Sequence, residues 1–137
     1  EGAGAVLAAQ KSDWGVATLA NADGQIAHYS IAIPSDFTTL TKAVVVLIGE
    51  DSADVRIYCQ TDFGADGEAH NIHSDSVAAA NVTLVADQIE EYDISGALTA
   101  IAAGDHVGIE FLRDGAQGGD TSTALLNVAH VLIEYTA

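Results

Sequence analysis

The sequence is poor in several residue types, and each shortage excludes a class of protein. A single Cys among 137 residues excludes a scaffold held together by disulfides, and 13 Gly without a regular period exclude a collagen-like chain. The longest apolar run, residues 43–48, is far shorter than the ~20 residues with which a helix crosses a bilayer. The chain is therefore expected to fold around a core of its own.

Basic residues are equally scarce. Only four Lys and Arg stand against 20 Asp and Glu, which gives a formal net charge of −16, and Lys11, Lys42, Arg56 and Arg113 are scattered singly. Because nucleic acids and anionic membranes are bound through clustered cations, neither is expected as a partner. Copies of this chain also repel one another, so an assembly requires salt, divalent cations or strong apolar contact.

Short apolar segments separated by turn residues predict the fold. Strands are expected at 14–20, 26–33, 42–49, 55–63, 82–85, 88–94, 107–111 and 125–135. This spacing, without a long amphipathic helix, predicts an all-β chain: an antiparallel β-sandwich, jelly-roll-like, with seven to nine strands. One sandwich domain is expected over residues 14–137, preceded by an N-terminal arm or first strand over 1–13.

Local composition adds three expectations to this outline. The Asn, Asp and Gly residues of 21–24 predict a turn that joins the first two strands as a hairpin. Residues 64–80, rich in Gly, Asp, His, Ser and Ala, are expected to be irregular. Residues 95–103 are expected to form one helical turn, with Leu98 and Ile101 as its inner face.

Two of the expected strands, 42–49 and 125–135, are apolar on both faces. A strand at the surface of a sandwich alternates apolar and polar side chains, so these two are expected to be covered on both sides. Each sheet of a sandwich has one inner face, and identical subunits are the simplest source of a second cover. The residues expected at a subunit interface are Val45, Leu47, Leu126, Val128 and Leu132.

One glycine-rich loop carries a candidate metal site. Asp62, Asp66 and Glu68 alternate there with Gly64 and Gly67. Hard carboxylate oxygens in such a loop are typical of Ca²⁺ ligands, although the spacing differs from that of an EF-hand. A solvated acidic loop is the alternative interpretation, since an acidic chain produces such clusters by chance.

Aromatic, imidazole and thiol groups give weaker indications of a binding, metal or catalytic site. Trp14 and Tyr58 are candidates for a sugar-stacking platform, although core packing and interface contacts account for aromatic residues equally well. His70 and His73 are too few for zinc, which takes three or four converging ligands. Cys59 shares the inward parity of its strand and is expected to be a buried, unreactive residue.

The last third of the chain shows a familiar order of elements. A Gly104-Asp105 turn precedes an alternating strand that ends in Arg113-Asp114, and a Gly119-Asp120-Thr121 loop leads to a last apolar strand. This order resembles the end of small β-sandwich structural and decoration proteins of tailed phages and related viruses. The resemblance implies a virion or extracellular location, other virion proteins as partners, and no catalytic residues.

Two functions are therefore expected as alternatives. The first is a non-enzymatic, self-assembling structural protein, such as a virion capsid or decoration protein or a subunit of an extracellular tube or filament, whose partners are copies of itself. The second is a carbohydrate- or calcium-dependent ligand-binding module that uses Trp14, Tyr58 and the acidic loop.

Overall fold

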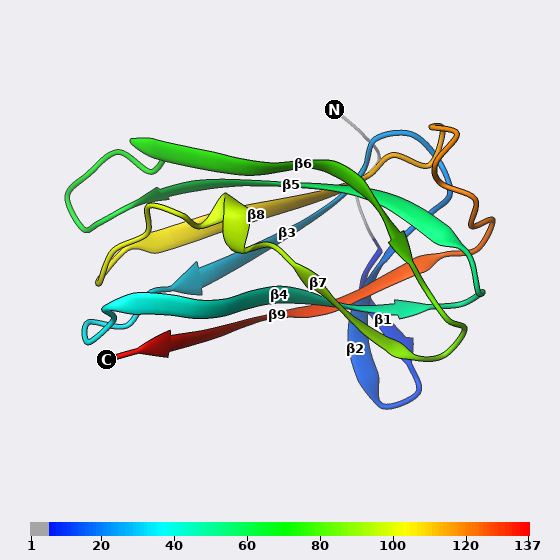
Figure 1. The fold of residues 1–137 in the computed structure, drawn as a ribbon, viewed down its shortest axis with the longest axis horizontal. Coiled ribbons are helices and arrows are strands. Elements are labelled where there is room, and N and C mark those ends of the chain that lie inside the picture. Colours follow the sequence, from blue (N-terminus) through cyan, green and yellow to red (C-terminus); the bar gives the residue numbers. More distant parts are fainter. Residues whose placement is uncertain (1–5) are drawn as a thin grey trace.

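The computed structural model describes residues 6–137, with side chains from residue 11 onward. The described residues form nine strands: β1 (Val6–Lys11), β2 (Trp14–Leu19), β3 (Gln25–Ala32), β4 (Thr39–Gly49), β5 (Asp54–Gly64), β6 (His73–Thr83), β7 (Ile89–Asp93), β8 (His106–Arg113) and β9 (Leu126–Thr136). A five-stranded sheet has the order β1-β2-β9-β4-β7, and a four-stranded sheet has the order β3-β8-β5-β6. All strand pairs are antiparallel, so the predicted β-sandwich of seven to nine strands is confirmed (Figure 1).

Most connections carry the chain from one sheet to the other. From β2 onward, only β5 and β6 are consecutive strands that pair with each other. The expected hairpin of the first two strands is therefore wrong: β2 pairs with β1 and β9, whereas β3 pairs with β8. Turn residues at 21–24 specify a tight change of direction, but they do not specify which sheet receives the next strand.

The inner faces of the two sheets supply the core, and this overturns most of the expected subunit interface. Val45, Leu47, Leu126 and Val128 are all 0% exposed in the isolated chain and belong to the core cluster. The prediction that these four form an interface is wrong, because their face of the five-stranded sheet packs on the other sheet of the same chain. Leu132 is half-buried and pairs with Val44 on the opposite face, because an irregularity between Val128 and His130 reverses the alternation of β9.

The opposite face of β4 is also apolar and also buried. Val44, Val46 and Ile48 are only 4–5% exposed, yet they lie outside the core cluster. Val16 of β2 is likewise buried outside that cluster. We call this outer surface of the five-stranded sheet the covered face, and its apolar members are Val16, Val44, Val46, Ile48 and Leu132.

The hairpin of β1 and β2 supplies the cover. In a flat sheet of this order, β1 would lie four strand spacings from β7, or about 19 Å. Instead, the Lys11 side chain reaches two residues at the far side of the sheet. Its Nζ atom lies 2.8 Å from Oε2 of Glu50, which follows β4, and 2.6 Å from Oδ1 of Asp87, which precedes β7. Trp14 stacks on His130 of β9, with ring centroids 6.1 Å apart. The hairpin therefore turns across β9 and β4 on the side away from the four-stranded sheet (Figure 1).

This arrangement confirms that the strand at 42–49 is covered on both faces, but by its own chain and not by a neighbour. Residues 6–11 form the first strand that was one of the two expectations for the N-terminal segment. Residues 1–5 of that segment lie outside the described residues. The boundary expected at residue 13 falls in the turn between β1 and β2.

Two local expectations have different outcomes. The segment 95–97 forms a single 3-10 turn, and Leu98 and Ile101 are buried below it, as predicted. The region expected to be irregular contains β6, an edge strand that pairs with β5 alone. Its run of Ser, Ala and Asn has no apolar alternation to reveal it, because an edge strand that packs loosely needs few large side chains.

Candidate functional site

Polar side chains form a row across the outer surface of the four-stranded sheet, which we call the open face. His28 of β3, Glu110 of β8 and Gln60 of β5 are direct cross-strand partners. Glu110 Oε2 lies 3.0 Å from His28 Nε2, and Glu110 Oε1 accepts a hydrogen bond of 2.8 Å from Gln60 Nε2. The carboxylate is thus held in a fixed orientation by a neighbour on each side.

Apolar side chains border this row on one side. Ile26, Leu112 and Tyr58 occupy the preceding register positions on the same three strands, and each is half-buried. The Tyr58 hydroxyl donates to Gln60 Oε1 over 3.3 Å. Apolar side chains on the open face are therefore followed, two residues along each strand, by side chains that form hydrogen bonds.

On the other side of the row, Gly108 has no side chain to cover the backbone of the sheet. Ser30, Gly108 and Asp62 are the next register partners, and a Cβ added at Gly108 would meet only the Asp62 carbonyl oxygen, 3.9 Å away. A groove of about 790 Å³ lies over these positions, bounded also by His106 and the loop that follows β5. Glycine within a strand is often found where another molecule approaches the backbone.

The loop that follows β5 closes one end of the groove. Glu68 Oε2 accepts a hydrogen bond of 2.9 Å from the Ala65 amide. Gly64 is packed so closely that an added Cβ would lie 2.7 Å from the Ala69 carbonyl oxygen. Both contacts fold the loop back on itself and fix the position of this wall.

The calcium site predicted in this loop is not formed. Asp62 points outward from β5, Asp66 is exposed, and Glu68 is bound to the Ala65 amide. Among residues 6–137, no group of three or more His, Cys, Asp and Glu side chains is arranged to hold a metal ion. Alternation along a strand and loop closure separate carboxylates that are close in sequence, which the spacing alone does not reveal.

The two aromatic candidates do not share a site. Tyr58 lies on the open face, whereas Trp14 lies on the covered face against His130. His70 lines the groove, but His73 begins β6 and packs on Phe63, with ring centroids 5.3 Å apart. Of the ligand-binding residues expected, only Tyr58 and the loop carboxylates remain near the groove.

The thiol offers no reactive group. Cys59 is 0% exposed, and burial, with a smaller contribution from the Glu110 charge, raises its pKa to about 12. At neutral pH it remains a protonated thiol and acts as a small apolar core residue. The interpretation of Cys59 as a buried, unreactive residue is confirmed.

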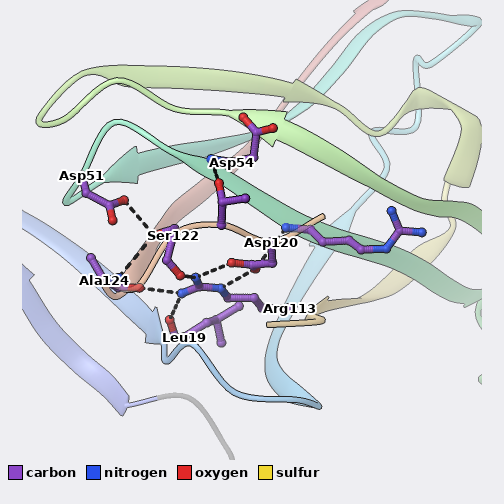
Figure 2. A network of polar contacts seen from close by, with 9 residues as sticks. Leu19, Asp51, Asp54, Arg113, Asp120, Ser122 and Ala124 are labelled. Atoms are coloured by element: carbon purple, nitrogen blue, oxygen red, sulfur yellow. Dashed lines mark hydrogen bonds and ion pairs between the residues drawn. The ribbon is translucent and has the colours of Figure 1, made fainter. Parts of the chain in front are cut away.

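A buried ion pair closes one end of the sandwich (Figure 2). Arg113 and Asp120 are joined by two hydrogen bonds of 2.9 Å, and both side chains are 0% exposed. The remaining guanidinium N–H groups donate to the carbonyl oxygens of Leu19, Ala124 and Ser122 over 2.7–3.0 Å. All five donors of Arg113 are therefore satisfied by its own chain, which leaves none for a ligand.

Asp120 extends the same network to β5. Its Oδ2 atom also accepts a hydrogen bond of 3.1 Å from the Arg56 amide. Nearby, Thr121 Oγ1 accepts from the Asp54 amide, and Ser122 Oγ donates to Asp51 over 2.7 Å. The loop after β8 is thus bound to both sheets, and its role is structural.

Sequence reasoning missed Arg113 and Gly108, although both carried a signal. Arg113 shares the inward parity of Val107, Ile109 and Phe111, which places a charge inside and implies a partner. Gly108 holds an outward position between His106 and Glu110, where any side chain would be tolerated by the sheet. The partners of these residues come from other strands, so their identity required the pairing of the sheet.

No protein-family model, no curated protein and no solved structure matches the chain. No helix among residues 6–137 is long and apolar enough to cross a membrane.

Proposed function

We propose that this chain is a non-enzymatic, self-associating structural module of a virion or another extracellular assembly, built as a jelly roll. The strand order supports the jelly roll: β2-β9-β4-β7 faces β3-β8-β5-β6, and the chain changes sheets at every connection from β2 to β9 except β5–β6. Eight strands in two sheets describe the jelly rolls of capsid and lectin domains. Because fold alone does not establish function, the proposal depends on a surface.

The observation that carries it is the apolar character of the covered face. Ile89 of β7 pairs with the buried Ile48 and is 55% exposed. The apolar surface of the covered face therefore continues from buried side chains to an exposed one. Trp14 is 38% exposed above His130. These two side chains offer a second copy an apolar contact continuous with the chain's own packing.

Electrostatics favours the same face. Lys11 and Lys42, the only lysines in the sequence, both lie there, paired with Glu50 and Asp87 and with Glu91. The −16 charge of each copy opposes association, and Arg56 is the only cation outside this face that is not buried, so the lysines make the covered face the less repulsive one. Copies of the chain, and other virion proteins with an apolar surface, are the proposed partners.

The test is the mass of the protein in solution at low and high salt. Association is expected to increase as salt screens the carboxylates, and Ile89→Asp is expected to abolish it. Ile72→Asp is the matched control, since Ile72 is also 55% exposed but lies in the loop after β5. A protein that stays monomeric at high concentration and high salt, or equal behaviour of both variants, contradicts the proposal.

A carbohydrate-binding module is the second candidate, and the groove on the open face favours it. It no longer includes calcium or Trp14, because the loop carboxylates are separated and Trp14 lies on the other sheet.

A further inference from the structure

We infer that the groove over Gly108 on the open face is a binding site for a neutral oligosaccharide. This goes beyond self-association and gives the second candidate function a ligand. The juxtaposition that supports it is the fixed row of His28, Glu110 and Gln60 beside a strip of bare backbone at Gly108.

The chemistry of the row matches hydroxyl groups. A sugar hydroxyl donates one hydrogen bond and accepts others, so its site requires donors and acceptors side by side. Glu110 and Asp62 provide acceptors, the Gln60 amide provides both kinds, and His28 and His106 provide ring nitrogens. The hydrogen bonds on each side of Glu110 orient these groups before a ligand arrives, which reduces the ordering cost of binding.

Charge excludes an anionic ligand. None of the four cations of the chain lines the groove: the lysines lie at the covered face, Arg113 is buried, and Arg56 donates to Asn81. A phosphorylated, sulfated or sialylated ligand would therefore face carboxylates without a counter-charge. A polyamine or basic peptide would be attracted by the same carboxylates, so spermine is the charged alternative that the experiment must test.

Shape supports a ring-sized ligand. A groove of about 790 Å³ lies within the usual range for small-molecule sites, and Gly108 leaves the backbone uncovered within it. The half-buried Leu112 and Tyr58 lie outside the groove, beyond the polar row, where a ligand longer than one ring could reach them. The loop wall at Ala65 and Glu68 limits the groove at one end.

The experiment titrates the protein with neutral gluco-, galacto-, manno- and xylo-oligosaccharides, with sialylated and sulfated glycans and spermine as competitors of other charge. Gly108→Val fills the floor and is expected to weaken binding of the neutral oligosaccharide by about tenfold or more. Gly15→Val is the matched control, because Gly15 is a strand glycine of the other sheet with nothing within 4 Å of an added Cβ. Gln60→Ala tests the row without changing the backbone.

The outcomes are distinct. A neutral oligosaccharide that binds the native chain and the Gly15 variant, but not the Gly108 and Gln60 variants, supports the site. Failure of every neutral oligosaccharide at millimolar concentration, binding of only charged probes, or equal binding by all variants overturns it. Because the mass of the same samples is measured separately, loss of self-association and loss of sugar binding are told apart.

Discussion

The open face and the covered face of this sandwich differ in what lies above them. The open face carries a polar row and a bare strip of backbone at Gly108, with solvent above. The covered face carries Val44, Val46 and Ile48, with the chain's own N-terminal hairpin above. Apolar side chains on both sides of a strand show that both sides are covered, but they do not show whether a neighbour or the chain itself provides the cover.

The two faces are expected to differ most in their response to an introduced charge. Val46→Asp buries a carboxylate under the hairpin and is expected to destabilise the fold by about 3 kcal/mol or more. Ser30→Asp, on the exposed surface of the open face, is expected to change stability by no more than about 0.5 kcal/mol. Urea unfolding followed by circular dichroism measures both, and equal effects would show that the hairpin does not seal its face.

A smaller effect is expected when one aromatic residue is removed from each face. Trp14→Ala removes the stack on His130 and is expected to cost about 1–2 kcal/mol, because the hairpin loses a contact that holds it in place. Tyr58→Ala, on the open face, is expected to cost less than about 1 kcal/mol. Amide exchange in β2 would report the difference: it is expected to accelerate in the Trp14 variant alone.

The smallest expected effect is a pH dependence of the hairpin. The hydrogen bond from Lys11, and then that from Asn127, lowers the pKa of Glu50 below its ordinary value of 4.5. Because the folded pKa is lowered, this contribution to stability is present above the ordinary pKa and is lost as the pH falls through the folded value. Trp14, the only Trp in the sequence, reports the change by its fluorescence.

Glu50→Gln separates this contribution from other titrations. The variant keeps an acceptor for Lys11 but has no charge to lose, so its acid fluorescence change is expected to be smaller than that of the native chain. An identical acid titration in both proteins would show that the Lys11 contact does not hold the hairpin on the covered face.

Much of the fold could be predicted because burial imposes a period of two on a strand. The alternation of β5 and β8 assigned their inward residues correctly, Ile57 and Phe111 among them. The pairing of β2 and the presence of β6 could not be predicted, since turn residues do not choose a sheet and a run of small residues shows no period. The groove could be predicted only in part, because its row of side chains comes from three strands whose register the sequence does not state.

The buried contact of Arg113 bears on how fast the molecule comes apart. Its guanidinium binds Leu19 at the end of β2 and Ala124 before β9, so the contact requires chain segments more than 90 residues apart to be in place together. Contacts of such long sequence separation carry a large loop-closure cost, so we expect this one to form late in folding. Interactions absent from the transition state slow unfolding without speeding folding. We therefore expect the contact between Arg113 and Leu19 to slow unfolding more than it speeds folding.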